Sequence, residues 1–216
     1  KGIPEKNIRK LAGKPLIAWT IEAARKSRYL DRVIVNTDSP KIAACARAYG
    51  AKTPFMRPKN LAQDSSRMID VILHTLSWCR AHNTIPDIIA LLQPTSPLRT
   101  AEDIDRAIRL LCQKGTQAVI SVCKAEYPPY WTNTLPADRR MNTFIDPRIK
   151  NANRQELPEF YRINGAIYFA FSEYLLANKG FVGKKTFAYI MPQSRSIDID
   201  SEIDCVTAAS LLKQTI

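Results

Sequence analysis

Short apolar runs and amphipathic stretches alternate along the chain. Residues 88–92 are five apolar side chains in a row, which suits a strand buried on both faces of a parallel sheet, and we expect it at the centre of that sheet. Residues 32–36 and 117–122 have the same character. Helical spacing of apolar positions lies between these runs, for example over residues 104–111. The alternation predicts an α/β fold on a mostly parallel, doubly wound sheet.

Capping residues predict where several helices begin. Thr100, with Asp103 three positions later, predicts a capping box. Ser39 comes directly before a proline that suits the first helical position. Ser201 and Asp204 repeat the box spacing close to the end of the chain. Each of these helices therefore starts directly after a polar segment.

Polar segments follow or precede the predicted strands. Residues 93–99 form a proline-stiffened turn at the end of the central strand, which is where ligands bind in open α/β sheets. The first seven residues form a turn containing Lys1 and Lys6, and lysines beside free backbone amides can hold a polyphosphate. In a third polar segment, residues 57–64, Arg57 could reach a base or a phosphate.

Two carboxylates lie close to the end of the chain. Asp198 and Asp200 are two positions apart, so in an extended segment both side chains point to the same side. Such a pair suits a magnesium ion that keeps several waters and bridges to substrate phosphates. We expect the pair to share one cleft with Lys6, at the edge of the sheet.

Residues 123–159 interrupt the regular pattern. Five prolines break the segment, and aromatic and basic side chains are frequent in it. A structureless loop of this length is uncommon inside a compact domain. We therefore expect an inserted excursion with a short hairpin, which embraces a second subunit rather than a nucleic acid.

Length and composition narrow the class of protein. With 216 residues, of which 45% are hydrophobic, the chain suits a single α/β domain. The net charge of +12 requires an anionic partner, either a nucleic acid or small molecules that carry phosphate and carboxylate. The apolar runs are too short for a membrane span and no secretory signal opens the chain, so we expect a cytoplasmic protein. The chain begins within a loop, and we expect a strand upstream of it.

Several motifs together resemble the N-acylneuraminate cytidylyltransferase family, the CMP-sialic acid synthetases. They run nearly from end to end in the order of that family: KGIPEKN at the start, NTD at residues 36–38, RPxxLAxD at 57–64, LLQPTSPLR at 91–99, RxNGAIY at 162–168 and SIDIDSEID at 196–204. The resemblance implies a Rossmann-like nucleotidyltransferase that joins CTP to a nonulosonic acid with Mg²⁺, giving a CMP-sugar and pyrophosphate.

The resemblance also implies roles for individual residues. The implied site consists of Lys1, Lys6, Asn7, Arg57 and Ser66 around the nucleotide, Gln93, Arg154, Arg162 and Tyr168 around the sugar, and Asp198 and Asp200 at the metal. Lys6 would stabilise charge on the phosphates. One aspartate would hold the ion, and the other would help remove the proton of the attacking hydroxyl.

In this family the excursion makes a domain-swapped dimer. The resemblance therefore implies a homodimer of one nucleotidyltransferase domain, residues 1–216, with residues 124–162 as the inserted dimerisation segment. It also places Arg154 in the site of the neighbouring subunit. The resemblance implies neither nucleic acid nor membrane as a partner.

Alternatives remain at the level of the sequence. Tyr130 and Trp131 stand near the place where related bacterial enzymes have a basic sugar contact, so legionaminic and pseudaminic acids stay open beside sialic acid. Asp198-Ile-Asp200 has the form of the DxD motif of a metal-dependent glycosyltransferase, although that motif normally follows an early strand. A nucleic-acid binder driven by the positive charge is a third possibility, with a steep dependence of affinity on salt.

Overall fold

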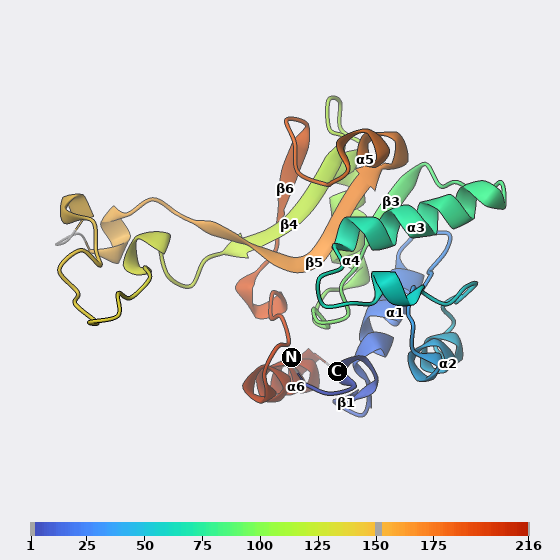
Figure 1. Cartoon of the computed structure of the whole chain (residues 1–216), viewed down its shortest axis with the longest axis horizontal. Helices are drawn as coiled ribbons and strands as arrows, with labels where there is room; N and C mark the ends of the chain where they lie inside the picture. Colours follow the sequence, from blue (N-terminus) through green and yellow to red (C-terminus); the bar gives the residue numbers. More distant parts are fainter. Residues whose placement is uncertain (1–2, 150–152, 216) are drawn as a thin grey trace.

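A computed structural model gives the fold and describes residues 3–149 and 153–215 of the chain (Figure 1). Its α-helices are α1 (Leu16–Lys26), α2 (Pro40–Ala48), α3 (Met68–Ala81), α4 (Ala101–Leu111), α5 (Ser172–Asn178) and α6 (Glu202–Thr215). Its strands are β1 (Lys10–Leu11), β2 (Lys14–Pro15), β3 (Ile88–Leu91), β4 (Ala118–Lys124), β5 (Tyr161–Phe171) and β6 (Thr186–Ile190). None of the described helices has the length and apolar character needed to cross a bilayer.

The main sheet is mixed, so the expectation of a mostly parallel sheet was wrong. In the described chain its strand order is β3-β5-β4-β6. β5 runs antiparallel to both β3 and β4, and only the β4–β6 pair is parallel. β3, which we expected at the centre, is an edge strand of this sheet. The expected strand over residues 32–36 is reduced to one parallel bridge, between Ile34 and Lys52.

The path of the chain explains the direction of β5. β4 leads out of the domain into the segment 125–160, which we call the arm, and β5 leads back from it (Figure 1). The two strands are therefore the stems of one long excursion, and stems that leave and return side by side must be antiparallel. The hairpin that we expected inside the arm is absent from its described residues, which contain short 3₁₀ turns instead.

Helices cover both faces of the sheet. α4 packs on one face, where buried residues of the helix meet Val119, Ile167 and Phe169 of the strands. α3 and α5 cover the other face, where Ile72, Leu76 and Leu175 contact Ala118 and Ala170. Neighbours in the strands thus point to opposite layers, as strand geometry requires.

A separate buried cluster joins the N-terminal hairpin to the C-terminal helix. The hairpin β1–β2 and the start of α1 pack against α6 through a shared set of apolar residues: Leu11, Leu16, Leu98, Ile199, Ala208 and Leu212. Figure 1 shows α6 and β1 side by side below the sheet. Burial of these side chains therefore sets the N-terminal turn beside the segment that contains Asp198 and Asp200.

The predicted capping box at the start of α4 is confirmed, and it contains a buried charge. Thr100 accepts a hydrogen bond from the backbone of Asp103, and the Asp103 carboxylate accepts one from the backbone of Thr100. Asp103 is only 1% exposed and also binds Arg195 through two hydrogen bonds of 2.8 and 3.0 Å and the Tyr189 hydroxyl. Burial alone would raise the pKa of Asp103, but the bonds from Arg195 and Thr100 outweigh it and lower this pKa below the ordinary 3.8.

Asp103→Asn is expected to destabilise the fold by about 3 kcal/mol at pH 7, because it leaves Arg195 without its carboxylate. Since the folded-state pKa of Asp103 is depressed, its contribution is complete above pH 3.8 and is lost as the pH falls through the folded-state value. Urea unfolding of both proteins from pH 7 to pH 3 measures this. A difference in stability that stays constant over that range would contradict the assignment.

Candidate active site

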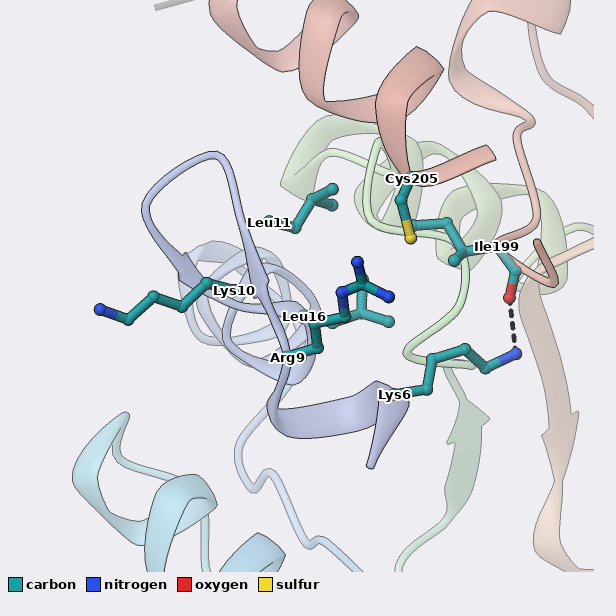
Figure 2. A pocket seen from close by; sticks show the side chains of 7 residues that line it. All are labelled: Lys6, Arg9, Lys10, Leu11, Leu16, Ile199 and Cys205. Atoms are coloured by element: carbon teal, nitrogen blue, oxygen red, sulfur yellow. Dashed lines mark hydrogen bonds between the residues drawn. The ribbon is translucent and has the colours of Figure 1, made fainter. Parts of the chain in front are cut away.

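The N-terminal turn and the C-terminal aspartates meet directly. The ammonium group of Lys6, from the 3₁₀ turn η1 (Lys6–Ile8), donates a hydrogen bond of 2.6 Å to the carbonyl oxygen of Ile199 and one of 3.0 Å to Oδ1 of Asp200. Figure 2 shows the Lys6 side chain extended toward this carbonyl oxygen. The predicted convergence of Lys6 with the acidic segment is therefore confirmed.

Basic and apolar side chains line a small hollow. Its lining residues come from both ends of the chain: Lys6, Arg9, Lys10, Leu11, Leu16, Ile199 and Cys205. Arg9 forms an ion pair with Glu202 at the start of α6, whereas Lys10 points away from the centre of the hollow (Figure 2). Of the basic residues that line the hollow, Lys6 is the one that hydrogen-bonds to the Asp198–Asp200 segment, through Ile199 and Asp200.

The Asp198 carboxylate has an unused acceptor. Its Oδ1 atom is buried and accepts no hydrogen bond from any described residue. A buried carboxylate oxygen without a donor is costly unless a cation or a substrate group completes it. The neighbouring Asp200 carboxylate is 77% exposed and is paired with Lys6. The pair therefore offers both a buried and an open oxygen to a cation.

The donor set fits magnesium better than a metal with many protein ligands. No group of three or more His, Cys, Asp or Glu side chains in the described part of the chain is placed to hold a metal. Mg²⁺ is commonly bound by one or two carboxylates, with waters and substrate phosphates completing its shell. Asp198 and Asp200 meet that requirement.

A bulge in β5 brings Gln93 close to Asp198. The register between β4 and β5 shifts between Ile120 and Val122, so that residues 164–167 of β5 lie opposite Ser121 alone. Gly165 has a φ of +73° in this bulge, and a Cβ atom there would lie 2.5 Å from Oε1 of Gln93 and 3.7 Å from Oδ2 of Asp198. A glycine is favoured at this position, because the positive φ strains other residues and a Cβ atom would push the end of the Gln93 side chain away, whereas 3.7 Å from Asp198 is an ordinary contact.

Buried hydrogen bonds hold the bulge and the acidic segment. Asn164 donates to the Ser196 hydroxyl at 2.8 Å and accepts from the Ser121 hydroxyl at 2.6 Å. The Ser96 hydroxyl donates to the carbonyl oxygen of Asn164. The backbone N–H of Ile199 donates to the carbonyl oxygen of Thr95 at 2.8 Å. The turn after β3 is thus connected to β5 and to the aspartates.

Tyr168 and Arg162 lie near Asp198 but in different environments. Tyr168 is half-buried in β5, and burial, followed by the charge of Asp198, raises its pKa. Arg162 forms two hydrogen bonds with Glu126, of 2.8 and 2.9 Å, and these raise its pKa. A sugar carboxylate would therefore have to compete with Glu126 for the Arg162 guanidinium.

The predicted nucleotide residues beyond Lys6 are less closely gathered. The Arg57 guanidinium donates hydrogen bonds to Oδ1 and to the carbonyl oxygen of Asn36, and burial lowers the pKa of Arg57. These bonds hold Arg57 at the turn that follows Ile34. The Ser66 hydroxyl accepts from the backbone of Gln63 and donates to that of Asn60, so it organises its own loop. Asn7 lies beside Lys6 in η1.

Two predicted site residues lie wholly or partly outside the described residues. Lys1 lies outside them entirely. The backbone of Arg154 lies in the 3₁₀ turn η5 (Arg154–Glu156) of the arm, but its side chain is outside the described part. Their predicted roles therefore remain predictions.

Sequence reasoning missed three residues of this region. It gave no role to Glu126 as the partner of Arg162 or to the buried Arg99, and it interpreted Gly165 only as part of a bulge or turn, without a place in the site. Gly165 and Arg99 lie inside the motifs already quoted, so their presence there was the available signal. Glu126 carried no signal, because its contact with Arg162 spans 36 positions along the chain.

Comparison with known proteins gives relatives of nearly full coverage. The chain is 36% identical to the CMP-N,N'-diacetyllegionaminic acid synthase of Legionella pneumophila, over 99% of this chain and 91% of that protein. It is 37% identical to the N-acylneuraminate cytidylyltransferase of Escherichia coli, over 98% of this chain but only 49% of that longer protein.

A solved structure has the same fold. The CMP:2-keto-3-deoxy-manno-octonic acid synthetase complexed with CTP superposes with a TM-score of 0.69, covering 100% of this chain and 95% of that one at 17% identity. The cytidylyltransferase family matches residues 1–213. On this match and on the two relatives above, the chain belongs to the cytidylyltransferase family, within the group that includes the N-acylneuraminate cytidylyltransferases and other CMP-nonulosonic acid synthetases.

Proposed function

We propose that this protein transfers CMP from CTP to the anomeric hydroxyl of a nonulosonic acid, with N-acetylneuraminate as its substrate. The observation that carries the proposal is the meeting of Lys6 with the Asp198–Asp200 segment, beside Gln93. This arrangement combines a cation for phosphate, two carboxylates and a polar side chain for a sugar at one edge of the sheet. The family assignment removes the reason for considering a DxD glycosyltransferase.

The proposed reaction is an in-line displacement. The anomeric oxygen attacks the α-phosphorus of CTP, the bond to the bridging oxygen breaks, and pyrophosphate leaves. One carboxylate of the Asp198 and Asp200 pair takes the proton of the attacking hydroxyl. Lys6 stabilises the charge that builds up on the phosphates. No protein nucleophile is needed, because phosphoryl transfer depends mainly on positioning and charge stabilisation.

We assign Mg²⁺ to Asp198 and Asp200. The support is the orphaned Oδ1 of Asp198 and the preference of this ion for carboxylates and phosphates. When bound, Mg²⁺ would neutralise phosphate charge and orient the triphosphate. Lys1, Asn7, Arg57 and Ser66 are assigned to the nucleotide, on the resemblance described above.

The sugar is assigned to the other side of Asp198. Gln93 and Tyr168 are the proposed contacts from the sheet, because both lie near this carboxylate. Arg162 and Arg154 are proposed to bind the carboxylate and acyl groups of the sugar, Arg154 from the neighbouring subunit. N,N'-diacetyllegionaminic acid is the second candidate substrate, because the Legionella relative is as similar to the chain as the Escherichia coli protein.

We propose a homodimer built on residues 124–162. Exposed apolar side chains occur along the arm, among them Tyr127, Leu135 and Met141. At the base of the arm, Ile163, Val122 and Ile190 form a row across three strands, since Val122 pairs with both of the others. Ile163 and Ile190 are more than half exposed, and such apolar rows are typical of interfaces.

Pyrophosphate release is expected only when CTP, a nonulosonic acid and Mg²⁺ are all present. A coupled phosphate assay with each component left out in turn measures this requirement. Running the assay with N-acetylneuraminate, N,N'-diacetyllegionaminic acid and pseudaminic acid identifies the sugar by its kcat/KM. Pyrophosphate formed from CTP without any of these acids would contradict the proposed acceptor.

Asp198→Asn is expected to reduce kcat at least about 100-fold, because it weakens the proposed metal site and removes a carboxylate charge. The melting temperature should change little, since the amide keeps the size of the carboxylate. Asp31→Asn is the matched control, because Asp31 is an exposed carboxylate outside the proposed site. Near-normal turnover in Asp198→Asn would refute the metal assignment.

Ile190→Glu is expected to convert the dimer into a monomer, because it places a charge in the apolar row at the base of the arm. Light scattering after size exclusion measures the mass of each variant. Val182→Glu is the matched control, because Val182 is 75% exposed but lies outside this row. An unchanged dimer mass in Ile190→Glu would place the interface elsewhere.

A further inference from the structure

Arg99 is a wholly buried cation under the turn that follows β3. Arg99 is 2% exposed, and burial lowers its pKa to about 9, although the charge of Asp103 acts in the opposite direction. Its Nη1 atom donates to three backbone carbonyls, those of Gln93, Ser96 and Ala166, over 2.9 to 3.3 Å. One guanidinium nitrogen therefore ties the turn to the bulge of β5.

Stability alone does not explain this arrangement. The Nε and Nη2 atoms of Arg99 are buried and have no hydrogen-bond partner among the described residues. No carboxylate of the described chain forms a salt bridge with Arg99. Asp103 is paired with Arg195 instead. A buried charge with unmade hydrogen bonds is destabilising, and an apolar side chain of similar size often replaces such a group without loss.

The carbonyls that Arg99 holds belong to the frame of the proposed site. Gln93 bears the side chain beside Gly165, and Ala166 directly follows Gly165 in the bulge. Between Gln93 and Ser96 lies Thr95, whose carbonyl oxygen accepts from the N–H of Ile199. The turn therefore determines both where Gln93 points and where the Asp198–Asp200 segment lies.

We infer that Arg99 is a positioning residue that fixes the two proposed metal carboxylates and Gln93 relative to each other by clamping the turn of residues 93–96 to the bulge of β5. This inference rests on the proposed function for the identity of the site. Arg99 touches neither substrate nor metal in this scheme. It acts through three backbone carbonyls and through the Thr95–Ile199 hydrogen bond.

The first test measures hydrogen exchange of a backbone amide and needs no substrate. In Arg99→Met, which keeps an unbranched, flexible side chain but removes its N–H donors, the Ile199 amide is expected to exchange with deuterium at least about tenfold faster. Arg99→Lys, which keeps a charge and N–H donors, should fall between this variant and the parent. Asp105→Asn is the matched control: Asp105 is also a buried charge, within α4, but it binds Ser27 and Arg28 rather than the turn.

The second test measures metal binding. The affinity for Mn²⁺ in the presence of CTP is measured from the EPR signal of free Mn²⁺. This affinity is expected to weaken about tenfold in Arg99→Met and to stay unchanged in Asp105→Asn. If the parent protein binds no Mn²⁺ with CTP, the proposed function fails and the inference fails with it. If the parent binds Mn²⁺ but Arg99→Met binds it equally well, only the inference fails.

Deuterium exchange tests the clamp independently of metal binding. Unchanged protection of Ile199 in Arg99→Met overturns the clamp, whatever the outcome with Mn²⁺. Equal acceleration in Asp105→Asn also overturns it, because the effect would then be general destabilisation. Should Arg99→Met fail to fold, Arg99→Lys decides, and protection of Ile199 equal to that of the parent in this variant would overturn the inference.

Discussion

The short segment Asp198-Ile199-Asp200 is held from two sides, and the candidate site depends on both contacts. From the sheet, the carbonyl oxygen of Thr95 accepts the N–H of Ile199. From the N-terminal turn, Lys6 donates to the carbonyl oxygen of Ile199. The Ile199 side chain is fully buried between them. Because the middle residue is fixed through its N–H, its C=O and its side chain, the backbone from which the two flanking carboxylates project is held in place.

Buried polar groups hold this frame, and those without a hydrogen-bond partner reduce the stability of the fold. Asn164 has its hydrogen bonds satisfied by serines from β4 and from the turn before Asp198. Nε and Nη2 of Arg99 and Oδ1 of Asp198 have no hydrogen-bond partner among the described residues. A fully satisfied network rigidifies a core, whereas an unsatisfied atom destabilises it until a partner arrives. Oδ1 of Asp198 lies in the proposed site, where a cation can supply the missing partner, whereas Nε and Nη2 of Arg99 stay buried beneath the turn.

The site also separates its charges by position. Lys6 and Arg9 face the hollow between the chain ends, while Arg162 lies at the base of the arm with Glu126. The proposed phosphates and the proposed sugar carboxylate would thus meet different cations on either side of the aspartates. Phosphate and carboxylate are both anions, so this spacing, rather than charge alone, would tell the two substrates apart.

Local sequence determined much of the protein. The helix starts at Ser39, Thr100 and Ser201 follow from side chains that bond to backbone a few residues away, and the structure has these bonds. The excursion after β4 was predictable from its prolines. The sequence also predicted that Lys6 and the segment of the two aspartates lie together, and the structure has Lys6 bonded to Ile199 and Asp200.

Only the tertiary structure decided the direction of β5, the edge position of β3 and the partners of Arg99 and Arg162. Strand periodicity is the same for parallel and antiparallel pairing, so direction depends on the path of the chain through the arm. The contacts of Arg99 with Ala166 and of Arg162 with Glu126 join residues 67 and 36 positions apart. Local rules act over a few residues, and such distant pairs are set by how the layers pack.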